Sequence, residues 1–348
     1  MKSSNNYTLY PDNRALEKAV EHYKSLVSDD DAKSANTDNT VALPDNFIYT
    51  RGNFEQHRYS AKVFENARDI LEAALVEGRQ PGDQPGREQS SLTWGTTQNS
   101  LGNILSALGQ QQKNADLFNK AIVSFNHALE VFSQDESPLD WAATQSNLGT
   151  ALQALGRQES DPKLLNKSID AYTAALLEYS RKETPEQWAS VMFQLAATFH
   201  TYGNFLKGNR NLQKSVVSYK NALAELDADN YALALAATHN NRGAVLHHLG
   251  ESEENPERLE EAIRSYDTAL TVCMEQQLPF HLAVLCRVNK ATARCVLAEL
   301  TKNAVLAEET ADEVELIIEC FPHVLQPLCL KHCEQQLSKA QSLSQSLS

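Results

Sequence analysis

The chain has 348 residues, of which 42% are hydrophobic and 22% are charged, and its formal net charge is −14. This is the composition of a folded globular protein, and the negative charge disfavours binding to nucleic-acid phosphates or to anionic membrane surfaces. The lysines and arginines are scattered among acids, so we expect no nucleic-acid partner and no membrane partner. The N-terminus is polar and no long apolar run occurs, which favours a cytoplasmic location.

The first part of the chain differs in composition from the rest. A helix is expected over residues 13–27 and a polar stretch over residues 28–40, so we assign residues 1–50 to an N-terminal helix with a mobile polar segment. A second helical pattern covers residues 54–77. The Pro- and Gly-rich residues 80–86 then predict a connector that is longer than the later ones.

From residue 90 onward, one pattern of residues returns at a spacing of 47 without insertion or deletion. The pattern contains a tryptophan, a small residue, a glycine and an aromatic residue. These columns are Trp94, Trp141, Trp188; Gly102, Gly149, Ala196, Gly243; Gly109, Gly156, Gly203, Gly250; and Phe125, Tyr172, Tyr219, Tyr266. A fixed period of this size indicates a solenoid of stacked units that share one core. We expect the aromatic side chains to fill gaps between helices rather than to stack on a ligand.

The period divides the chain into an array with two flanking segments. The array is assigned to residues 51–320 and the C-terminal capping helix with its tail to residues 321–348. The repeats within the array lie near residues 90–136, 137–183, 184–230, 231–277 and 278–320.

Each unit contains two helical patterns, which we call the first and the second helix. The first helix starts after Ser137-Pro138 and again after Thr184-Pro185, where the hydroxyl residue is a candidate N-cap and proline occupies the first turn. The second helix starts in the same way at Asp161-Pro162 and Asn255-Pro256. The recurring glycine between the two helices is expected to end the first helix in a left-handed conformation. The fold class is therefore predicted to be all-α, built from antiparallel helix pairs.

These patterns resemble a known repeat family. The second-helix sequence Ala121-Ile122-x-x-Phe125-x-x-Ala128-Leu129 resembles the second helix of a tetratricopeptide repeat, and Asn147-Leu148-Gly149-x-Ala151-Leu152-x-x-Leu155-Gly156 is similar to its first helix. The usual repeat has about 34 residues, so this unit is longer. The segment from Trp141 to Gly149 resembles long-period bacterial repeats that are often fused to caspase-like protease or signalling domains, which we do not find in this sequence. The resemblance implies a right-handed superhelical solenoid of about 12–13 helices.

The resemblance also implies that the first helices line a concave face. The polar columns expected there give the candidate partner-binding residues Asn99, Asn103, Asn147, Gln153, Gln194, His200, Asn240, Asn241 and His247. An amide side chain offers both a donor and an acceptor, so a ladder of amides can pair with the backbone of an extended peptide. The alternative is that these amides cap turns or bond to a neighbouring helix.

The predicted function is a protein- or peptide-binding scaffold or regulatory adaptor. Arg242 is the one cation near these columns in the central repeats, so the expected partner is a neutral or basic segment rather than an acidic C-terminus. The sequence contains no phosphate-binding loop, nucleophile elbow or metalloprotease motif, so we expect no enzyme activity, no catalytic residue and no cofactor. A self-associating structural protein, which would form a homo-oligomer, remains a second alternative.

Cysteine and histidine residues near the C-terminus provide another alternative. All six cysteines follow residue 270, and the set includes Cys320, His323, Cys329, His332 and Cys333. The last three share one helical face, and four such ligands could hold zinc. A cysteine on a helix is also a small buried hydrophobic residue, so we assign no metal site and keep a metal- or thiol-responsive sensor as an alternative function.

Overall fold

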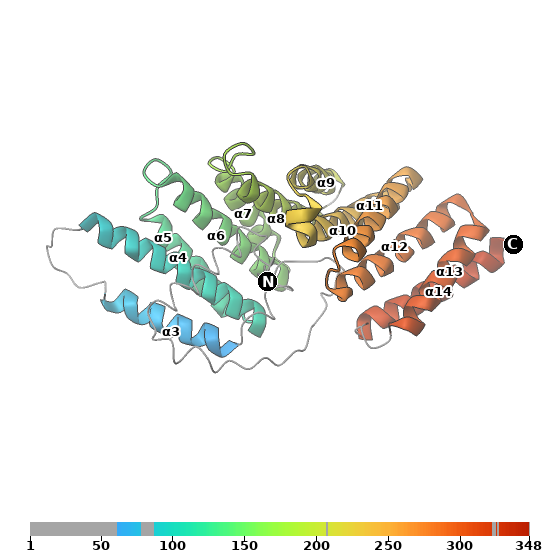
Figure 1. Ribbon diagram of the computed structural model, residues 1–348, viewed down its shortest axis with the longest axis horizontal. Coiled ribbons are helices and arrows are strands. Elements are labelled where there is room, and N and C mark those ends of the chain that lie inside the picture. Colours follow the sequence, from blue (N-terminus) through green and yellow to red (C-terminus); the bar gives the residue numbers. More distant parts are fainter. Residues whose placement is uncertain (1–60, 78–86, 207, 322–324, 326, 348) are drawn as a thin grey trace, which may run out of the picture. The chain divides into compact units, whose positions relative to one another are not determined.

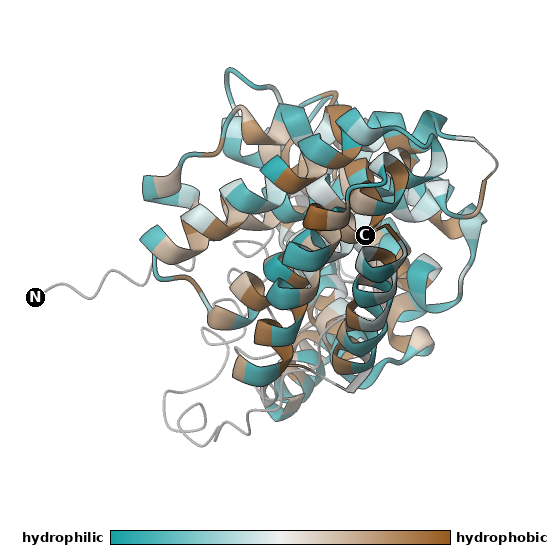
Figure 2. Ribbon diagram, turned by 90° about the vertical axis from the view of Figure 1, so that its right-hand side faces the viewer, coloured by the Kyte–Doolittle hydropathy of each residue, from teal (hydrophilic) through white to brown (hydrophobic). Residues whose placement is uncertain are grey.

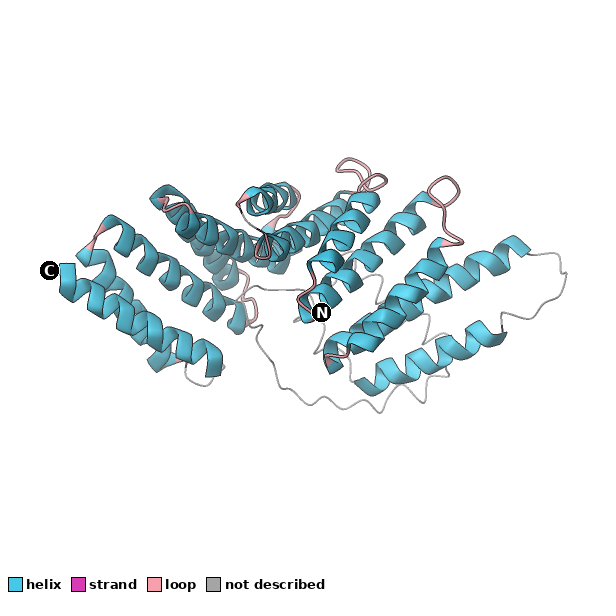
Figure 3. Cartoon of the chain, turned by 180° about the vertical axis from the view of Figure 1, so that it is seen from behind, coloured by secondary structure: helices cyan, strands magenta, loops and turns pink. Residues whose placement is uncertain are grey.

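The computed structural model describes residues 61–77, 87–206, 208–321, 325 and 327–347. All regular secondary structure in these residues is α-helical, and Figure 3 shows helices joined by loops, with no strand among them. The predicted all-α class is therefore confirmed for the described part of the chain. The expected helix over residues 13–27 and the polar stretch over 28–40 lie outside it.

Twelve helices occur in the described residues (Figure 1). In chain order they are α3 (Ala61–Glu77), α4 (Arg87–Gln112), α5 (Ala115–Leu129), α6 (Pro138–Gln158), α7 (Pro162–Ala175), α8 (Pro185–Gly203), α9 (Arg210–Leu223), α10 (Ala228–Ser252), α11 (Pro256–Glu275), α12 (Phe280–Thr301), α13 (Ala304–Cys320) and α14 (Pro327–Leu347). The helices α4, α6, α8, α10 and α12 are the first helices of the predicted repeats, and α5, α7, α9, α11 and α13 are the second helices.

The chain divides into two compact units, which hold α3 to α8 and α9 to α14. Within each unit every helix packs against the next one along the chain, and successive first helices also contact each other. Figure 2 shows hydrophobic and hydrophilic residues on the same helices, as expected for helices with one buried side. Sequential contact between neighbouring helices is the packing of a helical repeat protein.

Four of the five second helices begin at side-chain caps, and α9 has no such bond at Asn209. Asp161 accepts a hydrogen bond from the backbone N–H of Lys163 at 2.8 Å, and Asn255 accepts one from that of Arg258 at 3.2 Å. Asn114 caps α5 in the same way. Each cap satisfies a backbone donor that has no partner within its own helix, so the predicted caps at Asp161 and Asn255 are confirmed.

The predicted caps of the first helices are wrong in detail. Neither Ser137 nor Thr184 forms a side-chain cap bond. Their hydroxyl groups point back into the preceding connector, where Ser137 Oγ donates to the Ser133 carbonyl at 3.3 Å and Thr184 Oγ1 accepts from the Ser180 backbone N–H at 2.9 Å. The two hydroxyl groups therefore form hydrogen bonds within the connector and do not cap the helix that follows.

The expectation for the recurring glycine is also wrong. Gly156 and Gly250 lie inside their helices rather than at a left-handed end. A Cβ atom on Gly156 would lie 3.1 Å from Leu165 Cδ2, and one on Gly250 would lie 2.7 Å from Leu259 Cγ. These glycines are therefore required by the close approach of the two helices of a pair.

The left-handed residue after these first helices is not a glycine. It follows the recurring glycine by four positions, at Lys113, Ser160 and Glu254, with φ angles of 50°, 54° and 49°. The next backbone N–H then donates to the carbonyl of the recurring glycine, as from Asn114 to Gly109 at 2.9 Å. This is the bonding of a Schellman turn, which ends the helix and starts the connector.

The two helices of a pair interlock where an aromatic ring packs on a glycine. A Cβ atom on Gly102 would lie 2.5 Å from Phe125 Cε1, and one on Gly149 would lie 2.8 Å from Tyr172 Cε1. The rings of Phe125 and Tyr172 are fully buried. The tryptophans pack at the margins of the same apolar clusters, as we expected.

We predict that Gly102→Ala destabilises the protein by about 1–3 kcal/mol, because the Phe125 ring must move away from the new methyl group. Alanine is the better helix former by about 1 kcal/mol, so a net loss reports the steric collision. Chemical denaturation measures the free energy of unfolding. Combining the change with Phe125→Leu should recover part of the loss, and an unchanged midpoint for Gly102→Ala would contradict the interlock.

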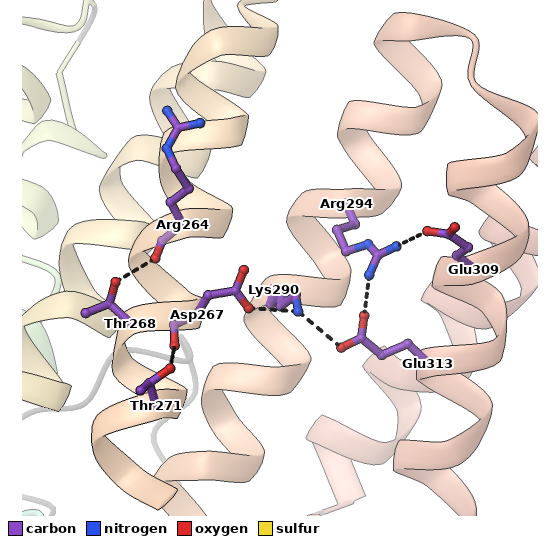
Figure 4. A network of polar contacts seen from close by, with 8 residues as sticks. All are labelled: Arg264, Asp267, Thr268, Thr271, Lys290, Arg294, Glu309 and Glu313. Carbon is purple, nitrogen blue, oxygen red and sulfur yellow. Dashed lines mark hydrogen bonds and ion pairs between the residues drawn. The ribbon is translucent and has the colours of Figure 1, made fainter. Parts of the chain in front are cut away.

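The last helix pair replaces this interlock with charges. Lys290 stands one 47-residue period after Gly243, and Glu313 stands one period after Tyr266. Lys290 Nζ lies 2.8 Å from Asp267 Oδ1 and 3.9 Å from Glu313 Oε1. Arg294 adds ion pairs to Glu313 at 3.1 Å and to Glu309 at 2.6 Å (Figure 4). Helices α11, α12 and α13 are thus joined by a half-buried network of ion pairs.

We predict that Glu313→Gln lowers the free energy of unfolding by about 1–3 kcal/mol, because this carboxylate pairs with two cations that are only partly exposed. The loss should shrink in high salt, because salt screens the ion pairs that Glu313 forms in the wild-type protein. Glu315→Gln on the exposed side of α13 is the matched control and should change stability by less than about 0.5 kcal/mol. Equal effects for the two variants would show that the network contributes nothing.

Helix α14 occupies the place of a further first helix. It begins at Pro327, one period after Phe280 at the start of α12. Cys329 and Cys333 pack into an apolar cluster with residues of α12 and α13. The opposite side of α14 carries exposed polar residues, namely Lys331, Glu334, Gln335, Ser338 and Gln341. A polar outer face is what a repeat stack needs where it ends. The helix continues to Leu347, through the residues that we expected to form a tail.

Candidate partner-binding surface

Amide side chains connect neighbouring first helices in the first unit. Asn147 on α6 donates from Nδ2 to Asn99 Oδ1 on α4 at 3.1 Å. Asn147 is buried, whereas Asn99 keeps part of its surface exposed. The two amides therefore satisfy each other across the seam between α4 and α6.

A second amide bridges α6 and α8. Gln153 donates from Nε2 to Thr198 Oγ1 at 2.7 Å and to the carbonyl oxygen of Gln194 at 3.2 Å. All three residues are buried. Because a buried polar group is costly without a partner, these bonds fix the position of α6 against α8.

The second unit repeats this arrangement between α10 and α12. Asn289 on α12 donates from Nδ2 to Asn240 Oδ1 at 3.0 Å, and Asn240 donates from its own Nδ2 to Asn241 Oδ1 at 3.2 Å. Asn240 and Asn241 are fully buried. Asn289 was not among the residues that we selected. In this repeat, the column that holds an amide or a serine in the other repeats contains a valine, and Asn289 follows that valine.

Burial separates the nine candidate residues into two groups. The buried group contains Asn147, Gln153, Gln194, His200, Asn240 and Asn241. The partly exposed group contains Asn99, Asn103 and His247. The buried residues lie within the protein, so surface for a partner comes from the second group and from the residues around it. The partner-binding role of the columns stays a prediction.

One partly exposed polar face belongs to α4. It consists of Thr96, Asn99, Asn103, Ser106 and Gln110, which we call the α4 stripe. Steps of three and four place these residues on one side of the helix, all are at least partly exposed, and none is charged. Thr96 and Gln110 were not predicted as site residues, although their spacing from Asn99 and Asn103 was readable in the sequence.

Two adjacent groups in the α4 stripe have unused hydrogen-bonding capacity. Asn103 Nδ2 and Ser106 Oγ form no hydrogen bond with any described residue. They lie one helical turn apart. Both atoms are buried although their residues are partly exposed, so each side chain would have to turn outward to bond to a bound backbone.

The equivalent faces of α6 and α8 are less available. On α6, Thr150 Oγ1 bonds to the Ser146 carbonyl at 3.1 Å and to the Tyr172 hydroxyl at 3.0 Å. On α8 the corresponding positions are Phe193 and Ala197, both buried. On α4, by contrast, all five polar residues of the stripe keep part of their surface exposed.

In the second unit, histidines take the place of amides. Burial lowers the pKa of His247 on α10 to about 4, with a further contribution from nearby positive groups that include His332 and Lys339. Burial also lowers the pKa of His332 on α14, whose Nε2 lies 2.9 Å from Thr292 Oγ1 on α12. These imidazoles are neutral at pH 7 and add no positive charge to the surface.

The single cation of the columns is already neutralised. Arg242 forms an ion pair with Glu261 and a hydrogen bond of 3.5 Å to Ser265 Oγ, both on α11. Its guanidinium group therefore has a carboxylate within the protein. The expectation that the surface does not recognise an acidic C-terminus stays a prediction.

The C-terminal cysteines and histidines do not converge. Cys329 and Cys333 face the apolar cluster of α12 and α13, while His332 faces Thr292. Cys320 is exposed at the end of α13, and His323 lies outside the described residues. In the part of the chain that the structure describes, no three His, Cys, Asp or Glu side chains are grouped so that they could hold a metal ion.

Comparison with other proteins adds no family assignment. Neither the known protein-family models nor the curated protein sequences match this chain. Among the described helices, none combines the length and the apolar character that crossing a membrane requires. The geometry of the first helices is therefore the main guide to function.

We predict that Gln153→Ala lowers the free energy of unfolding by about 1–3 kcal/mol, because the buried Thr198 hydroxyl loses its donor. Gln158→Ala is the matched control. That glutamine is exposed and donates a hydrogen bond of 2.9 Å to the Lys113 carbonyl, so its loss should cost less than about 0.5 kcal/mol. Chemical denaturation of both variants distinguishes them, and a similar small effect at both positions would argue against a stabilising seam.

Proposed function

We propose that the chain is a tetratricopeptide-like scaffold that binds a protein or an extended peptide segment and acts as an adaptor or regulator. In this proposal the first helices line the concave side of a right-handed superhelical solenoid of the long-period bacterial type, in the cytoplasm. The helical repeat architecture supports it, since stacked repeats provide extended binding surfaces. No catalytic residue and no cofactor form part of the proposal.

The α4 stripe is the observation that carries the proposal. Its side chains are uncharged and partly exposed, and they include two buried atoms without a partner, Asn103 Nδ2 and Ser106 Oγ, which would gain a hydrogen bond by turning toward a guest. An extended peptide presents alternating N–H and C=O groups, and amide and hydroxyl side chains can bond to both. Recognition of this kind depends on the backbone of the guest and tolerates many side chains.

The charge of the protein favours a neutral or basic guest. The formal net charge is −14, and Arg242 is already paired with Glu261. A basic segment would approach such a protein faster than an acidic one. Nucleic acid and anionic membranes are disfavoured as partners for the same reason.

We predict that Asn103→Ala combined with Ser106→Ala weakens peptide binding at least about tenfold, because the variant loses the two side chains that turn outward to bond to the guest. The change should leave stability intact, since neither group is bonded to a described residue in the free protein. Peptides selected from a displayed random library on the wild-type protein provide the ligands, and fluorescence anisotropy measures their affinity.

Asn119→Ala combined with Asn126→Ala removes two exposed amides from α5 and is the matched control. It should bind the selected peptides like the wild type. Undiminished binding by the α4 variant would overturn the assignment of the stripe. Failure to select any peptide, together with concentration-dependent assembly in light scattering, would favour the self-associating structural protein instead.

A further inference from the structure

Two buried thiols face each other across the joint between the fourth and fifth repeats. Cys273 lies in the last turn of α11 and Cys286 lies on α12, with exposed fractions of 3% and 0%. Their side chains form a hydrogen bond with each other. Both are free cysteines, and the helices that carry them pack against each other.

We propose that Cys273 and Cys286 form a disulfide bond under oxidising conditions and thereby lock α11 to α12. The bond would link the second helix of one repeat to the first helix of the next. The inference does not depend on what the scaffold binds.

A second pair of thiols provides an internal comparison. Cys329 and Cys333 are also hydrogen-bonded to each other, but both lie on α14, one turn apart. Cβ atoms at this spacing on a helix are about 5–6 Å apart, whereas a disulfide needs about 3.5–4.5 Å. The pair on α14 therefore cannot close while the helix is intact. The pair between α11 and α12 lies on two different helices, so the spacing within one helix does not set its separation.

The two thiols of the proposed site differ in acidity. The hydrogen bond from Cys286 lowers the pKa of Cys273, while burial, with the same bond, raises the pKa of Cys286. These directions favour Cys273 as the thiol that reacts first. It is also near the end of α11, where the next residue, Met274, is 63% exposed, so opening of the last turn of α11 gives an oxidant access to it.

Hydrogen peroxide is a sufficient oxidant. The Cys273 thiolate attacks one peroxide oxygen, so that an S–O bond forms, the O–O bond breaks and hydroxide leaves to become water. The Cys286 sulfur then attacks the Cys273 sulfur, so that the S–S bond forms and the S–O bond breaks. The second oxygen leaves as water with the remaining proton. Two thiols are oxidised and one peroxide is reduced to two waters.

The test uses the purified full-length chain carrying Cys320→Ala, which removes the one exposed thiol and with it disulfide exchange between molecules. The reduced protein is treated with hydrogen peroxide, and the remaining thiols are blocked with an alkylating reagent. Cleavage after Glu275 and after Arg287 separates Cys273 and Cys286 into different peptides. Mass spectrometry then identifies any peptides that are linked.

We expect a linked pair of peptides that contains Cys273 and Cys286 and has lost two hydrogen atoms. Cys329 and Cys333 should be recovered as alkylated thiols. Oxidation should also raise the melting temperature, and this rise should be absent in Cys273→Ala and retained in Cys329→Ala. Recovery of Cys273 and Cys286 as free thiols or as separate sulfinic acids would overturn the proposal, as would a Cys329–Cys333 disulfide formed at the same rate.

Discussion

The packing of an aromatic ring on a glycine backbone is the contact on which the repeat depends. Gly102 and Gly149 have no room for a Cβ atom, because the rings of Phe125 and Tyr172 already occupy that space. The ring position fixes how closely the two helices of a pair approach. Neither partner can change size without moving a helix, so the contact explains why both columns return at the same spacing along the chain. The buried amides and the Schellman turns belong to the same helix pairs, whose spacing this contact sets.

The pattern changes where the described chain ends. Lys290 and Glu313 replace the glycine and the ring, and their ion pairs extend to Asp267 and Arg294. The helix that follows has one apolar side and one polar side. A stack of identical pairs would always leave an apolar face uncovered, so the charged pair and α14 together provide a way to terminate it. In the first unit, α3 packs on α4.

Much of this fold could be predicted from the sequence, because a period of 47 with proline and Asx signals places helix starts closely. The packing between helices was harder to predict. A glycine near a helix end suits a left-handed turn and a close contact equally well, and only the neighbouring Leu165 and Leu259 decide for the contact. The same holds for the amides. Whether Asn147 points to a groove or to Asn99 depends on the distance between first helices, which no single-helix pattern contains.

The buried amides also bear on how similar repeats find the correct neighbour. Asn147 pairs with Asn99, Gln153 pairs with Thr198, and Asn240 pairs with Asn289. Each interface between first helices therefore has its own pair of residues at its own position along the helices. A hairpin stacked on the wrong neighbour, or exchanged with another molecule, would bury amides without partners. Repeat proteins are prone to such misassembly during folding. Polar seams that differ from one another penalise it, while the apolar contacts alone would accept almost any order.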